Sequence, residues 1–321
     1  MIITARSRIH VSLADMAFAS PRGFGGVGFA IRDPCTCVRI SPATQIQIDG
    51  IDKLDARSKF ALSELVERMV LRANKTGCKI ELLNSPPQHV GFGSQTSLSL
   101  AVAAGINAIY DIGLQQDELQ LLSGRGGGSG VGIHAFFHGG VIWDAGRARE
   151  EIVAYQPSGA GAPITLPPLM LRIHFPTTWS VVLALPDCLT ISGASEKEFF
   201  QNNTPIPELE SLRTMAELYH GVLPAFHNSD YRALARSLKT IHGFGFKSRE
   251  FRRLPESIQE AVQCLQSRGL AAGISSLGPL IYILQEDTNS ITELVEQCLR
   301  PLSLKSLSRV LGCDSGHDVS P

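Results

Sequence analysis

Three long stretches of this chain contain almost no charged side chains, and each carries a cluster of glycine and serine residues. No Asp, Glu, Lys or Arg occurs in 82–110 or in 269–285, and Arg125 is the only one in 119–143. Glycine lets backbone N–H groups approach a ligand closely, and the lack of carboxylates removes charge that would repel an anion. These stretches therefore favour a fold in which glycine-rich turns bind an anionic ligand.

The charge balance and the hydropathy pattern exclude several classes of partner. The 321 residues include 29 basic and 30 acidic ones. Because the net charge offers no polyanion-binding face, we expect no nucleic-acid partner. No uncharged apolar run of about 18 residues could span a bilayer, and the N-terminus lacks the apolar core of a signal peptide. We therefore expect no membrane partner and a cytoplasmic location.

The seven cysteines are an odd, scattered set, which predicts neither a disulfide framework nor a paired zinc ribbon. Cys35 and Cys37 could ligate a metal together, but no second pair matches them. His134 and His138 stand four residues apart, the spacing of two metal ligands on one helix face. Two glycines and a predicted strand follow them directly, so a continuous helix is not expected there.

Periodicity predicts an α+β chain of two lobes, because strands and helices interleave without a regular βαβ repeat. Strand patterns dominate the first 50 residues, and helical spacing follows in 60–70 and 98–109. We expect an N-terminal lobe at 1–165 and a C-terminal lobe at 166–321, joined by a Pro/Gly/Ala-rich linker at 156–168. The last 15 or so residues are expected to form a frayed tail.

The first glycine-rich turn precedes the helical pattern at 98–109. Its amide donors would lie at the positive end of a helix, which suits a phosphate group. The alternative is an ordinary serine-capped helix after a glycine turn. The segment is neither a Walker loop nor a Rossmann fingerprint. Its candidate ligand-binding residues are Gly91, Gly93, Ser94, Gln95 and Thr96.

The second glycine-rich turn has five glycines and one arginine within 124–130. Such a run can form a nest of N–H donors, and the guanidinium group of Arg125 can grip phosphate oxygens in pairs. The alternative is a flexible connection. The candidates are Arg125, Gly126, Gly127, Gly128, Ser129 and Gly130. No Gly-x-Ser-x-Gly elbow occurs, so covalent catalysis has no positive support.

These motifs resemble one superfamily. Gly91-Phe92-Gly93-Ser94 is similar to the Gly-Leu-Gly-Ser loop of the galactokinase, homoserine kinase, mevalonate kinase and phosphomevalonate kinase (GHMP) superfamily. Within it, the ordered motifs across about 1–285 resemble the β-ribofuranosylaminobenzene 5′-phosphate synthase family. The other motifs are Ser7-Arg8-Ile9-His10 with Asp15, Gly25-Gly26-Val27-Gly28, Gly124-Arg125-Gly126-Gly127 with Ser129-Gly130, His138-Gly139-Gly140, Gly245-Phe246-Lys247 and Gly273-Ile274-Ser275-Ser276-Leu277-Gly278-Pro279.

The resemblance implies a two-lobed small-molecule-kinase (GHMP) fold with a ferredoxin-like second lobe. It also implies a decarboxylating phosphoribosyltransferase that joins ribose 5-phosphate from phosphoribosyl pyrophosphate to a carboxylated amino-arene, with loss of pyrophosphate and CO₂. The arene is 4-aminobenzoate in tetrahydromethanopterin synthesis, and related enzymes that make C-nucleosides use heteroaromatics. Mg²⁺ as cofactor and a homodimer are further implications. Because CO₂ leaves instead of a proton, no strong general base is required.

On the same resemblance, charge partners for the donor are Arg8, Arg125 and Lys247, and the candidate catalytic residues are His10 and Asp15. Either of the last two could equally be a satisfied strand residue. His138, Ser275 and Ser276 complete the candidate substrate-binding set, and no metal ligand is identified.

The chain departs from the family pattern at three positions. Phe24 replaces a frequent acidic residue, Gln95 replaces a frequent glycine, and Leu277 replaces an aromatic residue. These changes bear on the identity of the arene more than on the ribosyl donor. Two alternatives stay open: an ATP-dependent small-molecule kinase of the same superfamily, and a binding protein that retains the fold without turnover.

Overall fold

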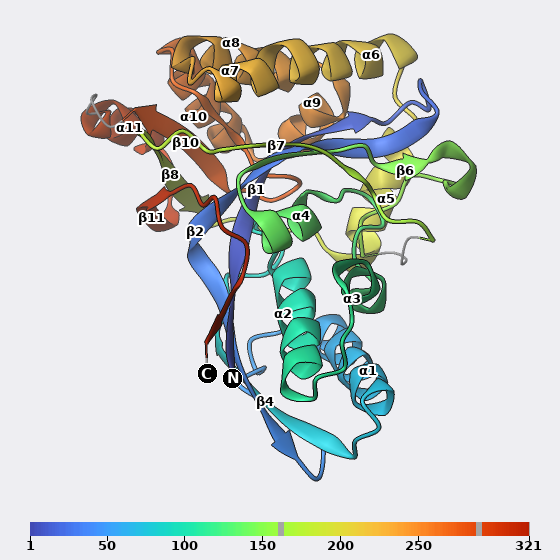
Figure 1. Cartoon of the computed structure of the whole chain (residues 1–321). Helices are drawn as coiled ribbons and strands as arrows, with labels where there is room; N and C mark the ends of the chain where they lie inside the picture. Colours follow the sequence, from blue (N-terminus) through green and yellow to red (C-terminus); the bar gives the residue numbers. More distant parts are fainter. Residues whose placement is uncertain (160–163, 287–290, 321) are drawn as a thin grey trace.

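The first two strands, β1 and β2, run through the middle of the protein and connect its two lobes (Figure 1). The computed structural model describes residues 1–159, 164–286 and 291–320. Both strands are longer than the pattern predicted. Some residues of each strand pack against the helices of the first lobe, and others pack against the second lobe. The strands of the first sheet are β1 (Ile2–Asp15), β2 (Arg22–Ala43), β3 (Gln47–Asp49), β4 (Gly77–Asn84), β5 (Val141–Asp144), β6 (Arg147–Ala148), β7 (Leu169–Ile173) and β12 (Asp318–Ser320).

The first sheet is mainly antiparallel, in the order β12-β1-β2-β4-β3, with β5 paired to β2 and β7. Helix α2 lies against β1 and β2 and packs on α1. A Cβ atom on Gly105 would lie 2.2 Å from Cδ1 of Ile40, so glycine allows α2 to approach the sheet this closely. The helices beside this sheet are α1 (Ala56–Arg72), α2 (Ser94–Ile109), α3 (Gln116–Ser123), α4 (Val131–His138) and the 3₁₀ turn η1 (Arg149–Glu151).

The second sheet has the antiparallel order β11-β8-β10-β9, which is the 4-1-3-2 strand order of a ferredoxin-like unit. The predicted α+β class and ferredoxin-like second lobe are confirmed. Its strands are β8 (Trp179–Pro186), β9 (Ala272–Ile274), β10 (Ile281–Glu286) and β11 (Leu304–Leu311). Its helices are α5 (Gly193–Asn203), α6 (Glu208–Glu217), the π turn η2 (Leu218–Val222), α7 (Leu223–His227), α8 (Tyr231–His242), α9 (Gly245–Arg252), α10 (Glu256–Ser267) and α11 (Thr292–Leu299).

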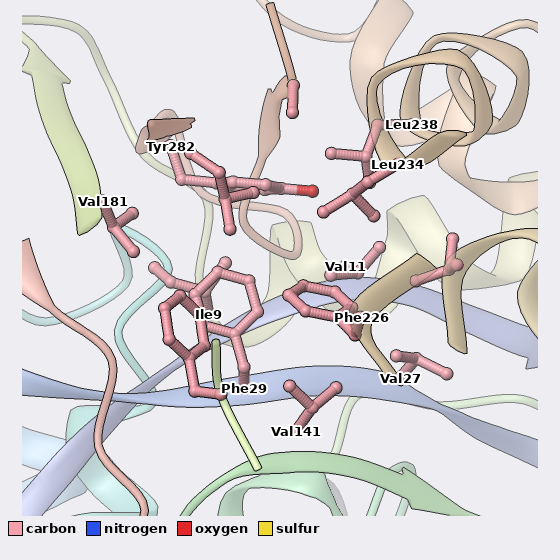
Figure 2. Close-up of a cluster of buried hydrophobic side chains, with 14 of the residues drawn as sticks. Ile9, Val11, Val27, Phe29, Val141, Val181, Phe226, Leu234, Leu238 and Tyr282 are labelled. Carbon is pink, nitrogen blue, oxygen red and sulfur yellow. The ribbon is translucent and has the colours of Figure 1, made fainter. Parts of the chain in front are cut away.

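One hydrophobic core joins the two sheets (Figure 2). Ile9 and Phe29 of the first sheet face Tyr282 of the second, and Phe226 of α7 fills the space beside them. Strand β7, which follows residue 165, belongs to the first sheet. Sheet pairing therefore crosses the lobe boundary placed at residue 165, and that division stays a prediction.

Two local predictions are wrong. The C-terminal segment is not frayed: β12 pairs with β1, and His317 stacks on Phe136 with ring centroids 4.2 Å apart. The segment containing His134 and His138 forms the continuous helix α4, which ends at Gly139, whose φ of 63° favours glycine. No local pattern could reveal the pairing of β12, because its partner strand lies at the other end of the sequence.

The cysteines also differ from the prediction. Cys264 of α10 and Cys298 of α11 form a disulfide, whereas Cys35 and Cys37 are free. Across the described residues, no group of three His, Cys, Asp or Glu side chains could hold a metal ion. In the same residues, no helix has the length and apolar character needed to cross a bilayer.

Candidate active site

A cavity of about 640 Å³ lies where the two lobes meet, and residues from several distant parts of the chain line it. They include residues of β1, of the two glycine-rich turns, of α5, of α9 and of the loop at 276–278. This volume is typical of a small-molecule site. Twelve of the residues predicted to bind a ligand line it: Arg8, His10, Gly91, Gly93, Ser94, Gln95, Thr96, Arg125, Gly126, Gly128, Ser129 and Ser276.

The first glycine-rich turn places the start of α2 at the cavity. Gly93 has φ 74° at the N-cap, a left-handed conformation that favours glycine, and no side chain caps the helix. The N–H of Thr96 donates to the carbonyl of Gly93 at 3.0 Å, whereas those of Ser94 and Gln95 have no side-chain acceptor and can bind an anion. The side chain of Gln95 points to α1 instead, where it donates to Oγ of Ser58 at 2.5 Å.

The second glycine-rich turn lies beside the first. Arg125 Nε donates to Oγ1 of Thr96 at 3.2 Å and so bridges the two turns. Arg8 extends from β1 beneath the first turn, where its guanidinium group donates to the carbonyl of Gly91. Burial lowers the pKa of both arginines to about 10, so both stay charged at neutral pH. The two turns and two guanidinium groups form one cationic end of the cavity.

Another part of the lining is apolar. Leu13, Phe24, Phe200 and Leu277 belong to one buried cluster and also line the cavity. The Phe24 ring packs edge-on against Tyr155, with ring centroids 4.9 Å apart. No sequence pattern indicated Phe200 on α5, and Phe24 and Leu277 stood out only as departures from a family pattern. We name these four residues the apolar wall.

Other polar residues at the cavity were also missed. Arg57 of α1 donates to the carbonyl of Gly159 at 2.5 Å, and His89 bonds Asp55 at 2.7 Å. Glu196 of α5 lines the cavity, and among the contacts described here it has no hydrogen-bond or ion-pair partner. Burial raises the pKa of Glu196 despite the opposing effect of nearby cations. Helical spacing alone predicts neither α5 nor its contact with the cavity.

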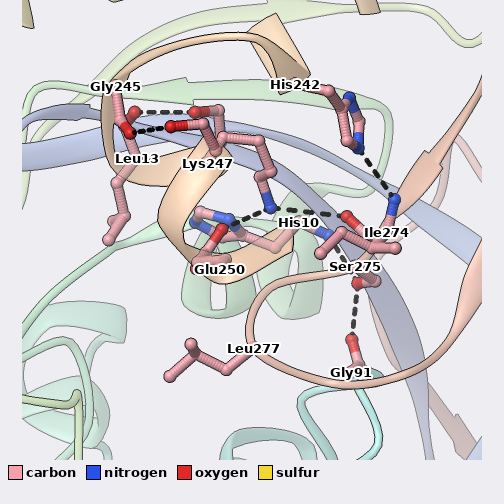
Figure 3. Close-up of polar contacts among 12 residues, drawn as sticks. His10, Leu13, Gly91, His242, Gly245, Lys247, Glu250, Ile274, Ser275 and Leu277 are labelled. Atoms are coloured by element: carbon pink, nitrogen blue, oxygen red, sulfur yellow. Dashed lines mark hydrogen bonds and ion pairs between the residues drawn. The ribbon is translucent and has the colours of Figure 1, made fainter. Parts of the chain in front are cut away.

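Ser275 acts through the backbone rather than by lining the cavity (Figure 3). Its Oγ donates to the carbonyl of Gly91 at 2.7 Å and accepts the backbone N–H of His10 at 3.0 Å. The next residue, Ser276, lines the cavity with φ 54°. Ser275 thus joins β1, the first glycine-rich turn and the loop after β9.

Lys247 does not line the cavity. Its ammonium group is fully buried and lies 2.6 Å from Oε2 of Glu250, one helical turn further along α9. Glu250 was missed by the sequence analysis, yet it lines the cavity. Lys247 therefore neutralises a buried carboxylate, and the predicted direct contact with a phosphate does not fit this position.

Asp15, Gly127, Gly130 and His138 also lie outside the lining. The carboxylate of Asp15 accepts backbone N–H groups of 17, 19 and 20 and the hydroxyl of Ser211, so it organises the turn after β1. His138 bonds the side chain of Gln116 at the far end of α4. The prediction that Asp15 is catalytic does not fit a carboxylate engaged in this way, and the satisfied-residue alternative does.

The buried His242 supports the loop after β9 and should make stability depend on pH. Its Nδ1 donates to the carbonyl of Leu238 at 2.7 Å, and its Nε2 accepts the N–H of Ile274 at 3.3 Å. Burial lowers its pKa from 6.5 to about 4. As the pH falls from 6.5 to 4, His242 binds a proton in the unfolded chain but stays neutral in the folded chain. The free energy of unfolding therefore decreases. The loss is on the order of 3 kcal/mol.

Urea unfolding at pH 7 and pH 4.5 measures this effect. His242→Gln should lose clearly less stability over this interval than the unsubstituted protein. Exposed His227 gives the matched control, and His227→Gln should keep the original pH dependence. An unchanged pH dependence in His242→Gln would show that other groups carry the acid sensitivity.

The fold and the cationic, glycine-rich site define a protein of the GHMP class. Residues 60–140 match the GHMP kinase N-terminal domain. The structure is similar to a phosphomevalonate kinase from Streptococcus pneumoniae, with a TM-score of 0.69, 11% identity and coverage of 96% of this chain and 99% of that one. It is also similar to a homoserine kinase from Cytophaga hutchinsonii, with a TM-score of 0.67, 15% identity and coverage of 99% and 96%. These likenesses concern the fold.

Sequence similarity identifies the family within this class. The chain is 32% identical over 298 residues to the β-ribofuranosylphenol 5′-phosphate synthase of Archaeoglobus fulgidus, covering 92% of this chain and 90% of that protein. It is 29% identical to the protein of the same name from Methanothermobacter thermautotrophicus, covering 94% of each. A 4-diphosphocytidyl-2-C-methyl-D-erythritol kinase of Paenarthrobacter aurescens is 23% identical, covering 82% and 74%. The chain belongs to the β-ribofuranosylphenol 5′-phosphate synthase family, which is a family of enzymes.

Proposed function

We propose that this protein transfers ribose 5-phosphate from phosphoribosyl pyrophosphate to a ring carbon of a carboxylated arene, releasing pyrophosphate and CO₂. One observation carries the proposal: a single cavity combines a cationic, amide-rich end with the apolar wall of Leu13, Phe24, Phe200 and Leu277. A polyanionic donor fits the first part, and a flat aromatic acceptor fits the second. A kinase that acts on a small alcohol has less need of such a wall.

The chemistry follows from these two parts. The C1–O bond to pyrophosphate breaks as the electron-rich ring carbon attacks C1, and the ring then loses its carboxylate as CO₂, which restores aromaticity. Arg8, Arg125 and the amides of the two turns stabilise the charge that develops on the departing pyrophosphate. The apolar wall orients the ring and excludes water, which would otherwise attack C1.

Mg²⁺ fits this site as an ion that enters with the donor. A magnesium ion commonly binds through one or two carboxylates together with substrate phosphates, and neutralises charge on the leaving group. Glu196 is the cavity carboxylate with no partner among the described contacts, whereas Asp55 and Glu250 are already paired. We therefore propose Glu196 as the protein ligand.

The names of the relatives bear on the acceptor, because they specify a ribosylated phenol. We therefore propose 4-hydroxybenzoate beside 4-aminobenzoate as a candidate acceptor. Both carry a ring substituent that donates electrons to the attacking carbon and a carboxylate that can leave. The predicted homodimer is part of the same proposal.

The decisive assay incubates the protein with phosphoribosyl pyrophosphate, Mg²⁺ and each arene, and measures pyrophosphate and CO₂. We expect both products in equal amounts with at least one arene. Turnover with a different carboxylated arene would keep the reaction and change the acceptor. Formation of ADP from ATP, with no pyrophosphate released from the donor, would instead identify a kinase. Donor binding without turnover of any arene would favour a binding protein.

A further inference from the structure

A buried carboxylate outside the predicted site is connected to the cavity by a chain of hydrogen bonds. Asp144 ends β5 and is fully buried. Its Oδ1 accepts the N–H of Gly146 at 2.9 Å, and its Oδ2 accepts the hydroxyl of Ser129 at 2.8 Å. Ser129 Oγ in turn lies 3.2 Å from Nε2 of His10. Ser129 and His10 line the cavity and Asp144 does not.

The direction of these bonds follows from the donors available. An ionised carboxylate only accepts, so the single hydroxyl proton of Ser129 goes to Asp144. Ser129 Oγ then accepts from its other neighbours, which are the N–H of Val131 at 3.2 Å and Nε2 of His10. The proton of a neutral His10 must therefore lie on Nε2, and Nδ1 carries a lone pair.

His10 stays neutral in this environment. Burial lowers its pKa well below the usual value, and the charges of Arg8 and Lys247 act in the same direction. Its Nδ1 is buried, and within the described part of the chain it has no hydrogen-bond partner. Such an unsatisfied acceptor costs free energy, so a small shift of the His10 ring that brings Nδ1 to a hydroxyl group in the cavity would be favourable.

We propose that Asp144 is a positioning residue that acts through Ser129 to hold His10 in the Nε2–H tautomer, so that Nδ1 can accept a hydrogen bond from a hydroxyl group of the substrate. The identity of that hydroxyl, on the ribose or on the arene, rests on the proposed function. The tautomer itself does not, because the chain of hydrogen bonds dictates it without any ligand.

A purely structural role for Asp144 is the competing explanation. Its carboxylate also receives backbone N–H groups of Gly130 and Val131 at the start of α4. That role explains why an acid stands there but predicts no effect on the histidine ring. The two explanations are separated by substitutions at Ser129 and Asp144 for which the tautomer of His10 is measured directly.

Nitrogen NMR of histidine-labelled protein measures the tautomer directly. The His10 signals are assigned by their loss in His10→Gln. In the unsubstituted protein at pH 7.5 we expect a protonated Nε2 and an unprotonated Nδ1. Ser129→Ala keeps Asp144 but removes the hydroxyl, so it should lose the preference for one tautomer. Ser129→Thr keeps a hydroxyl and should restore it.

Asp144→Asn gives the sharper test because it should reverse the tautomer. Gly146 donates to one side chain oxygen, so the amide oxygen of Asn should face Gly146 and the NH₂ group should face Ser129. The amide then donates to Ser129, whose hydroxyl proton is free to point to His10 Nε2, and the ring proton moves to Nδ1. An Nδ1–H ring in the unsubstituted protein, or an unchanged tautomer in both Asp144→Asn and Ser129→Ala, would overturn the proposal.

Turnover supplies the second measurement. With phosphoribosyl pyrophosphate and the accepted arene, Asp144→Asn should lower kcat about tenfold or more and should change the Kd of the donor by a clearly smaller factor. Equal losses in both quantities would indicate a general disturbance of the site and contradict positioning. If Asp144→Asn does not fold, the Ser129→Ala and Ser129→Thr pair decides: a preference kept in Ser129→Ala overturns the proposal. If no arene is turned over, the proposed reaction fails while the NMR result still decides the tautomer.

Discussion

Arg125→Ala should weaken binding of phosphoribosyl pyrophosphate about 100-fold, because it removes two charge-assisted hydrogen bonds to phosphate oxygens. Arg125 bridges the two glycine-rich turns through Thr96, so its guanidinium group is already oriented before a ligand arrives. Little conformational entropy is then lost on binding. Isothermal titration calorimetry with the donor and Mg²⁺ measures the change.

The matched control is Arg236→Ala on the exposed face of α8. It removes the same charge from the protein and should leave the Kd of the donor within about twofold, because exposed charges are screened at physiological salt. Arg125→Lys separates charge from geometry: a point charge should recover only part of the affinity. Unchanged affinity in Arg125→Ala would remove this residue from the donor site.

Glu250→Gln should lower the free energy of unfolding by about 3–5 kcal/mol, because it leaves the ammonium group of Lys247 buried without a counter-charge. The Lys247 side chain is 0% exposed and that of Glu250 is 3% exposed. The double variant Lys247→Met/Glu250→Gln has no charge at either position of this pair and should recover much of the loss. Urea unfolding of the three proteins gives the comparison.

An exposed ion pair provides the control for this prediction. Lys305 lies 2.9 Å from Asp187, with both side chains more than half exposed. Asp187→Asn should cost less than about 1 kcal/mol, because water solvates each charge alone. If Glu250→Gln cost no more than Asp187→Asn, Lys247 would not depend on its partner, and its earlier assignment as a phosphate ligand would regain support.

The parts of the site that could be predicted share a local cause. Gly93 and the amides after it are adjacent in the sequence, and a glycine turn before an uncharged helix produces its amide cluster without help from distant residues. The same holds for the turn that contains Arg125. Phe24 of β2 and Phe200 of α5, in contrast, line the same cavity from distant parts of the chain, and neither helical nor strand periodicity relates two such segments.

Two predicted residues show where local reasoning fails. Asp15 and Lys247 each stand in a motif and carry a charge suited to a catalytic or phosphate-binding site. In the structure, the Asp15 carboxylate accepts backbone N–H groups of the turn after β1, and the Lys247 ammonium group neutralises the buried carboxylate of Glu250. A buried charged side chain loses its hydration and therefore needs a counter-charge or hydrogen-bond partners nearby, whatever motif it stands in.

The alternating and helical segments, the two amide-rich turns and the absence of competing carboxylates around them could be predicted, because they depend on residues within a few positions of one another. The apolar wall, the strand β12, the disulfide and the hydrogen-bond chain from Asp144 to His10 became visible only in the folded protein. Each of these joins groups from distant parts of the chain. Such pairings depend on which surfaces are buried together, and no short window of sequence contains that information.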